Sequence, residues 1–237
     1  MNKIEKLKSI IDKSNNIVFF FFFWVSTESG IPDFRSSDGL YNSAPEEILS
    51  HSFFVQSPEI FFEFYKKNLI FRNAKPNKAH EVLAKMEKDG KLSGIITQNI
   101  DSLHQIAGSK NVFELHGSIS KNYCTKCEKN YTLEEFLSIN SNVPYCNCGG
   151  IIKPDVVLYE EQLNWKTIED AVSLLEKSEV LIVGGTSLVV NPAASMINYF
   201  KGKHFIIINF DPTPYDSVAE LKKKKKIGDV LSRVYPL

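Results

Sequence analysis

The chain has 237 residues, of which 43% are hydrophobic and 24% charged, which is enough to bury the core of one large domain or of one domain with a small insert. Its 28 basic residues balance 28 acidic ones, so no basic excess predicts a nucleic-acid partner. The longest apolar run, Ile17 to Val25, is far shorter than the roughly 20 residues of a membrane-spanning helix. The N-terminus lacks the pattern of a secretory signal. We therefore expect a cytoplasmic protein with no membrane partner.

Apolar runs alternate with helical patterns along the chain. The runs are rich in β-branched and aromatic residues, as buried strands of parallel sheets are, and they span residues 17–23, 94–97, 112–115, 180–183 and 205–208. Apolar residues at helical spacing predict helices near residues 4–11, 78–88, 166–177 and 192–200. This alternation predicts an α/β fold with a Rossmann-like, doubly wound parallel sheet.

Two stretches interrupt the alternation. Residues 117–153 hold all four cysteines and only a short helical pattern, Leu133 to Leu137, which predicts a small inserted module. Residues 36–73 are rich in phenylalanine and predict a helical cap over a groove, with rings that are either core or ligand contacts. The rest would form the Rossmann-like large domain of a single catalytic unit, 1–237, from residues 1–35, 74–116 and 154–237.

The cysteines form two close pairs. Each pair can present two thiolates from one turn to the same ion, and four thiolates complete the closed tetrahedral shell of a structural zinc. Gly149 and Gly150 permit the tight turn that such a pair needs. We expect one zinc ion, rather than free or buried thiols, held by Cys124, Cys127, Cys146 and Cys148. A catalytic zinc, and with it a zinc hydrolase, is disfavoured because no histidine or carboxylate joins the cluster.

Polar segments directly follow four of the predicted strands. The carboxyl ends of parallel strands meet at one edge of the sheet, where Rossmann-like folds bind their ligands. That convergence favours a nucleotide-binding enzyme; the segments are Ser26–Arg35, Thr97–His104, His116–Gly117 and Gly184–Ser187. A generic NAD oxidoreductase is disfavoured, because Gly-x-Gly-x-x-Gly is absent after the first strand.

At these residues the chain resembles the sirtuin family of NAD-dependent protein deacetylases, in its bacterial type. The segments that carry the resemblance stand in the family's order, from about Leu7 to Leu231. They are Ser29-Gly-Ile-Pro-Asp-Phe-Arg35, Pro76-Asn-x-Ala-His80, Thr97-Gln-Asn-Ile-Asp101, Leu115-His-Gly117, Pro154-Asp-Val-Val157, Gly185-Thr-Ser-Leu-x-Val-x-Pro-Ala193 and Ile208-Asn209 with Thr213.

The resemblance implies removal of an acyl group from lysine, with release of nicotinamide and acyl-ADP-ribose. In that reaction His116 is the general base that takes a proton from a ribose hydroxyl, a task suited to a pKa near 6.5. Asn99 and Asp101 complete the catalytic set and hold the nicotinamide ribose, its carboxamide and a water. The other histidines keep a structural interpretation: His51, His80, His104 and His204.

The resemblance also implies where NAD and the acyl-lysine protein or peptide bind, with acetyl as the default acyl group. The NAD set is Ser26, Thr27, Asp33, Phe34, Arg35, Gln98, Asn99, Ile100, Asp101, Gly185, Thr186, Ser187 and Asn209. Asp33 has an alternative role as a turn cap after Pro32. The peptide would add as a strand beside Val156, Val157, Leu158, Leu188 and Val189.

Two segments depart from the family. Its Gly-Ala-Gly phosphate loop falls on Phe22-Phe23-Trp24, whose rings would fill the space that lets a backbone approach a pyrophosphate. We therefore predict weak or absent NAD binding, and the alternative function is an impaired or redesigned sirtuin scaffold that keeps the fold and the peptide groove. Lys222 to Lys226 replace a short apolar strand. They predict a solvated loop or a patch that binds polyanions.

Overall fold

The computed structural model describes residues 2–21, 23–32, 46–185, 193–209 and 212–237. Its larger sheet has six parallel strands in the order β3-β2-β1-β7-β8-β9. The order reverses between β1 and β7, which is the pattern of dinucleotide-binding folds. The strands are β1 Ile17–Phe21, β2 Leu92–Thr97, β3 Val112–Glu114, β7 Val180–Gly184, β8 His204–Ile208 and β9 Leu221–Lys223.

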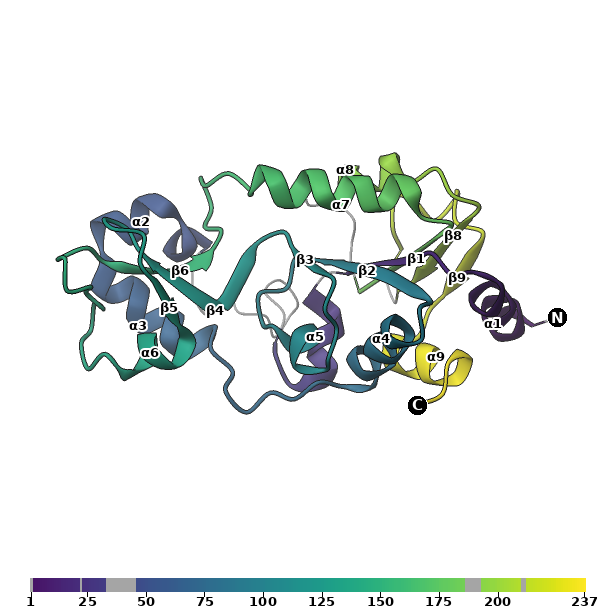
Figure 1. Ribbon diagram of the computed structural model, residues 1–237, viewed down its shortest axis with the longest axis horizontal. Coiled ribbons are helices and arrows are strands. Elements are labelled where there is room, and N and C mark those ends of the chain that lie inside the picture. Colours follow the sequence, from purple (N-terminus) through teal and green to yellow (C-terminus); the bar gives the residue numbers. More distant parts are fainter. Residues whose placement is uncertain (1, 22, 33–45, 186–192, 210–211) are drawn as a thin grey trace.

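Helices cover both faces of this sheet, as Figure 1 shows. One face packs against α1 Lys3–Lys13, α4 Lys78–Lys88 and α9 Ile227–Val234. The other packs against α7 Trp165–Lys177 and the short helices α8 Ala193–Met196 and η4 Ile197–Tyr199.

Strand β1 divides its buried side chains between the two faces. Phe19 and Phe21 enter one core and Val18 and Phe20 the other. A strand covered on both sides reads as a continuous apolar run, and the predicted doubly wound α/β fold is confirmed.

A smaller antiparallel sheet, in the order β5-β4-β6, lies at the other end of the molecule (Figure 1). Its strands are β4 Gly117–Cys124, β5 Asn130–Thr132 and β6 Ile152–Val156, and the helix α6 Leu133–Ser138 follows β5. The cap segment supplies η3 Glu46–Leu49, α2 His51–Gln56 and α3 Pro58–Asn68. The division into domains stays a prediction, and β6 crosses its boundary at residue 153.

The phenylalanine-rich segment forms a third core between the cap helices and the smaller sheet. Phe61, Phe62, Tyr65 and Phe136 are all fully buried there. The Phe61 ring packs edge-on against Phe62 with centroids 5.3 Å apart, and Phe62 contacts Phe136 at 6.0 Å. Of the two interpretations of this segment, the structure supports the core.

Some boundaries differ from those predicted. β1 ends at Phe21, where its partners β2 and β7 also end, and a 3-10 helix, η1 Phe23–Ser29, follows. The predicted helix at 192–200 is reduced to α8 and η4. A short helix, α5 Leu103–Ile106, follows β2. No helix among the described residues combines the length and apolar character needed to cross a membrane.

The lysine tract is only in part the predicted loop. Lys222 and Lys223 lie in β9, which pairs with β8, so the loop prediction is wrong for these two residues. The Lys222 ammonium is paired with the Asp216 carboxylate, which compensates its charge. Lys224, Lys225 and Lys226 are exposed.

Gly117 joins His116 to β4 in a conformation that requires glycine. Its φ is 72°, and a Cβ built on it would lie 1.8 Å from the Asp155 carbonyl oxygen. That carbonyl belongs to β6, which pairs with β4 at this point. A side chain here would therefore push the two strands apart.

Gly117→Ala is expected to lower the free energy of unfolding by about 3 kcal/mol or more, because strain and a backbone clash combine. Urea unfolding measures it. Gly90→Ala is the control, since Gly90 has φ 73° but no atom within 4 Å of its Cβ position, and left-handed strain alone costs about 1–2 kcal/mol. Equal losses in the two variants would contradict the steric argument.

Candidate active site

Polar side chains from two strand ends meet at the carboxyl edge of the larger sheet. Ser26 lies in η1 after β1, and Asn99 and Asp101 follow β2. The Ser26 hydroxyl donates to Asp101 Oδ2 at 2.5 Å, and Asn99 Nδ2 donates to Ser26 Oγ at 2.8 Å. Asn99 Nδ2 also lies 3.3 Å from Asp101 Oδ2. The structure thus brings these three predicted residues into one hydrogen-bonded triangle.

Backbone contacts fix the orientation of this triangle. Asp101 Oδ1 accepts from the Leu103 N–H at 2.9 Å, so both of its oxygens are engaged within the protein. The Asn99 N–H donates to Thr97 Oγ1 at 3.0 Å. The Gln98 N–H donates to the Phe21 carbonyl at 3.3 Å, which joins the ends of β1 and β2.

The buried amides of Gln98 and Asn99 carry polar atoms without a partner. Within the described chain, neither the nitrogen nor the oxygen of the Gln98 amide has a hydrogen-bond partner, and Asn99 Oδ1 has none. Unpaired buried polar atoms are costly and rare in proteins. A bound carboxamide, which carries both donors and an acceptor, would satisfy them.

His116 stands between this site and the smaller sheet. Burial lowers its pKa to about 4, although a hydrogen bond to the Gln98 backbone opposes the shift. Its ring is therefore neutral at pH 7 and can accept a proton. The His116 carbonyl accepts from the Val157 N–H at 3.0 Å, so the segment that follows β6 lies directly beside the histidine.

The other predicted NAD residues are only partly described. Thr27 is exposed and its hydroxyl donates to the Trp24 carbonyl at 2.8 Å. Gly185 follows β7 at φ 62°, Asn209 is buried at the end of β8, and Ile100 is half-buried. Outside the described residues lie Phe22, Asp33, Phe34, Arg35, Thr186, Ser187, Leu188 and Val189.

The start of η1, where Phe23 and Trp24 lie, is hydrogen-bonded to the end of β7, across the point where the strand order reverses. The Trp24 N–H donates to the Gly185 carbonyl at 3.4 Å, and the Trp24 side chain is partly exposed. Phe21, one residue before the loop, is fully buried and stacks on Phe19 with ring centroids 4.8 Å apart. The apolar run thus enters the core up to the edge of the site.

Asn77 is a supporting residue that sequence reasoning quoted only as part of a motif. Its side-chain oxygen accepts from the Ala79 N–H at 2.9 Å and so caps α4. Its side-chain nitrogen donates to the Val25 carbonyl at 2.8 Å and to Ser29 Oγ at 2.9 Å. Asn77 therefore holds η1 in place. The spacing Asn77-x-x-His80 forms a capping box and could have indicated the helix cap, whereas the bonds to η1 depend on the fold.

Two buried histidines lie behind Asp101. His104 stacks on Phe21 with ring centroids 5.5 Å apart and contacts His80 at 4.6 Å. Burial lowers the pKa of His80 to about 4, against the attraction of Asp101. Burial also lowers the pKa of His104 well below its usual value, and His80 lowers it further. Both rings are neutral core residues, which agrees with their structural interpretation.

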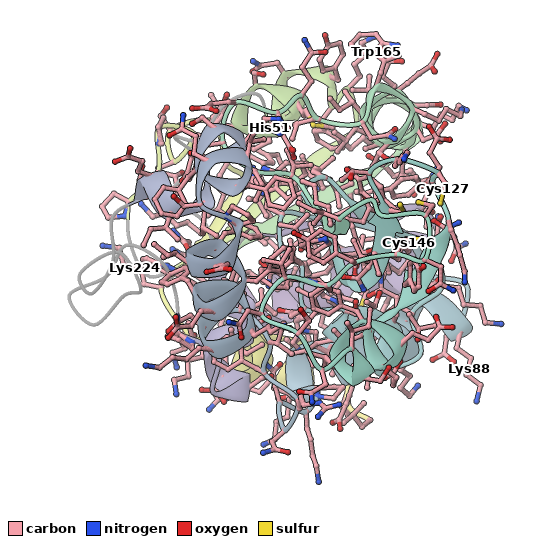
Figure 2. The ribbon with its side chains drawn as sticks, turned by 90° about the vertical axis from the view of Figure 1, so that its left-hand side faces the viewer. His51, Lys88, Cys127, Cys146, Trp165 and Lys224 are labelled. Carbon is pink, nitrogen blue, oxygen red and sulfur yellow. The ribbon has the colours of Figure 1, made fainter. Side chains whose placement is uncertain are left out.

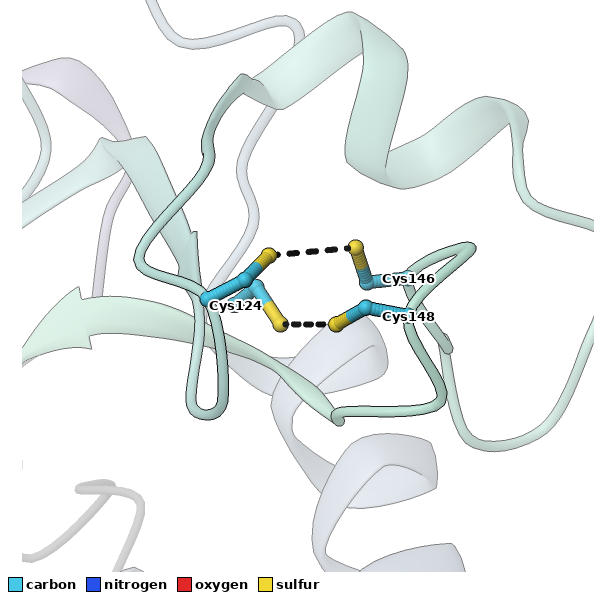
Figure 3. Close-up of side chains that lie close together, drawn as sticks. Cys124, Cys146 and Cys148 are labelled. Carbon is cyan, nitrogen blue, oxygen red and sulfur yellow. Dashed lines mark hydrogen bonds between the residues drawn. The ribbon is translucent and has the colours of Figure 1, made fainter.

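The four cysteines form one compact cluster, shown in Figure 3. Their Sγ atoms all lie within 4.8 Å of one another. Cys124 and Cys148 are separated by 3.4 Å and Cys127 and Cys146 by 3.7 Å, too far for disulfides. A tetrahedral zinc with bonds of about 2.3 Å places its sulfurs about 3.8 Å apart. The cluster therefore fits one zinc ion with no open coordination position.

Comparison with known proteins identifies the family. The pattern of the Sir2 family matches residues 24–192. This chain belongs to the Sir2 family. It is 56% identical to the NAD-dependent protein deacetylase of Clostridium perfringens, with 98% of each chain covered. It is 48% identical to that of Staphylococcus aureus strain Mu50, with 93% of each covered.

Solved sirtuin structures have the same fold. One Sir2 protein, described with a deacetylated p53 peptide and 3'-O-acetyl ADP-ribose, gives a TM-score of 0.90 at 38% identity and covers 98% of this chain and 97% of its own. Another, described with a p53 peptide and NAD+, gives 0.89 at 38% identity with the same coverage. The predicted NAD-dependent protein deacetylase is confirmed, and the comparisons lend no support to the non-catalytic alternative.

Removal of zinc is expected to unfold the smaller sheet of this sirtuin. The parent should hold about one zinc ion per chain. Cys148→Ser should lose most of this zinc and several kcal/mol of stability, since metal binding and folding are coupled. Atomic absorption and thermal unfolding measure both. Thr125→Ser, between two ligands, should keep the metal. A full equivalent of zinc in Cys148→Ser would contradict the four-thiolate site.

The buried neutral histidines should make stability fall in acid. The folded pKa values of His80, His104 and His116 lie below the unfolded value of about 6.5, so the unfolded chain binds more protons between about pH 6.5 and 4. The free energy of unfolding should decrease through this window as pH falls, by about 1–3 kcal/mol per histidine. Urea unfolding at several pH values measures the slope. His104→Leu should flatten it, and an unchanged slope would refute the assignment.

Proposed function

We propose that His116, Asn99 and Asp101 carry catalysis in this sirtuin and that it removes acetyl groups from protein lysines. The observation that supports this is a neutral, half-buried His116, hydrogen-bonded to the backbone of Gln98, together with the triangle of Ser26, Asn99 and Asp101. It lies at the edge where the strand order reverses. Acidic acyl chains are not favoured, because the sequence alone shows no pair of tyrosine and arginine that suggests a site for one. Acetyl is therefore the default.

His116 acts as the general base. Because burial keeps its ring neutral, it can take a proton from a ribose hydroxyl of the bound nucleotide without first losing one itself. NAD, when bound, supplies the ribosyl carbon that receives the acyl oxygen as nicotinamide leaves. Asp101 positions Ser26 and Asn99 through its hydrogen bonds, and the unpaired amide of Gln98, together with the unpaired Oδ1 of Asn99, holds the carboxamide.

The remaining implied residues complete the NAD site. By the resemblance, Phe34 would exclude water from the reacting carbon, and Asp33, Arg35 and Thr27 would contact the cofactor. Ile100 lines the nicotinamide pocket. The adenosine and phosphate end is held by Gly185, Thr186, Ser187 and Asn209. Ser26 borders both halves of the site, since it belongs to η1 and contacts Asp101.

The peptide adds as a strand beside Val156, Val157 and Leu158. β6 is an outer strand of the smaller sheet, and Val157 is hydrogen-bonded to the His116 backbone. A peptide on this edge therefore delivers its acyl-lysine next to the base. Strand addition uses backbone hydrogen bonds and so tolerates varied sequences. By the resemblance, Leu188 and Val189 belong to the same peptide site.

A cytoplasmic location is also part of this proposal. The four cysteines are unpaired thiols arranged for a metal. Such sets are kept in reducing compartments, whereas oxidising ones favour disulfides.

Nicotinamide release from NAD in the presence of an acetyl-lysine peptide tests the function and the loop together. The parent chain should release nicotinamide only with the peptide, and His116→Ala should reduce the rate about 10²–10⁴-fold. The variant Phe22→Gly, Phe23→Ala, Trp24→Gly should bind NAD about ten-fold tighter or better by calorimetry, because glycine lets backbone N–H groups approach the phosphates.

These measurements separate the two claims. Equal NAD affinity of the parent and the restored variant would refute the loop argument and leave the function intact. No peptide-dependent release from either protein would refute the function. Release by His116→Ala at the parent rate would refute the assignment of the base.

A further inference from the structure

Lys153 is a buried charge in β6. Its residue is only 3% exposed, and its ammonium donates to the Val156 carbonyl at 2.9 Å, to Glu161 Oε2 at 3.0 Å and to the Pro154 carbonyl at 3.3 Å. The three contacts use all of its donors. A lysine this deeply buried is retained only where its partners compensate the loss of water.

Glu161 joins Lys153 to the helical cap. Burial raises the pKa of Glu161, but hydrogen bonds from Leu158 and His51, together with Lys153, outweigh it and leave the pKa below its usual value. The ionised carboxylate can only accept. Its Oε2 accepts from Lys153 and from the Leu158 N–H at 2.9 Å. Its Oε1 accepts from His51 Nδ1 at 2.8 Å, so that nitrogen carries the proton.

Further hydrogen bonds join the start of α2 to residues 159 and 160. The His51 N–H donates to the Tyr159 carbonyl and the Tyr159 N–H donates to the Leu49 carbonyl, both at 3.0 Å. Glu160 has φ 75°, a strained conformation for a residue with a side chain. Its carboxylate accepts from the Ser52 N–H at 2.8 Å and the Ser52 hydroxyl at 2.9 Å. Figure 2 looks onto this end of the molecule, where His51 is labelled.

Residues 156–161 are therefore held by three parts of the molecule. Lys153 ties them to the smaller sheet, His51 and its neighbours tie them to the cap, and Val157 ties them to the backbone of His116. We propose that the Lys153–Glu161–His51 network positions this segment for the acyl-lysine peptide and so sets peptide affinity while leaving NAD affinity unchanged. The inference rests on the proposed placement of the peptide beside Val156, Val157 and Leu158.

Binding of a fluorescent acetyl-lysine peptide, followed by anisotropy without NAD, tests this role independently of catalysis. Lys153→Met should weaken peptide binding about ten-fold and raise the peptide KM to match, because a small displacement of a positioning segment is costly. The KM for NAD should stay within about two-fold. Lys153→Arg keeps the charge and should restore most of the peptide affinity.

Two further variants keep the test decisive. His51→Ala removes a half-exposed partner without leaving a buried charge unpaired, and it should weaken peptide binding even if Lys153→Met fails to fold. Lys201→Met is the matched control, since it removes a surface ion pair, 2.8 Å long, with Glu176 of α7. This variant should bind the peptide as the parent does. Thermal unfolding of each variant reports stability separately.

Parent-like peptide binding by folded Lys153→Met or by His51→Ala would overturn the network's role. A parallel rise in the KM for NAD would overturn its selectivity for the peptide. If the parent chain itself binds no acetylated peptide, the proposed peptide site fails and takes this inference with it. That result differs from equal binding by parent and variants, which refutes the network alone.

Discussion

Strand β1 hydrogen-bonds to β2 on one edge and to β7 on the other, and both pairings are parallel. Parallel strands deliver the segments that follow them to the same side of a sheet. Ser26 therefore meets Asn99 and Asp101, although they lie far apart in the chain. The helix η1 also reaches Gly185 across the point where the strand order reverses. The position of the site is a consequence of the sheet order.

Two ionisable side chains that are shielded from water, His116 and Lys153, lie in different electrostatic environments. His116 is kept neutral at pH 7 by burial, which lowers its pKa to about 4. Lys153, by contrast, forms an ion pair with Glu161 at 3.0 Å. In the proposed function the neutral ring accepts a proton, and in the proposed network the ion pair positions the peptide segment.

Sequence reasoning succeeds where a local pattern reflects burial on both sides. The apolar runs predict β1, β2, β7 and β8 because these strands have cores on both faces. The cysteine spacing predicts the cluster because each pair occupies one turn. Motif order predicts the convergence of Ser26, Asn99 and Asp101.

Prediction from the sequence fails where a structure depends on partners outside the local pattern. Lys222 and Lys223 enter β9 because backbone pairing with β8 does not depend on side-chain polarity, and Asp216 neutralises Lys222. No motif spacing links His51 to Lys153 and Glu161, which only the folded chain brings together.

The pairing of β1 with β7 also constrains how the chain is made. Ile17 pairs with Val180, so β1 gains this neighbour only after the ribosome has synthesised both the cap and the cysteine-bearing sheet. Long-range pairing slows folding. Until it forms, residues 17–21 remain an apolar, uncharged segment of the kind that self-associates. Nascent β1 therefore has to avoid contact with other chains until β7 has emerged from the ribosome.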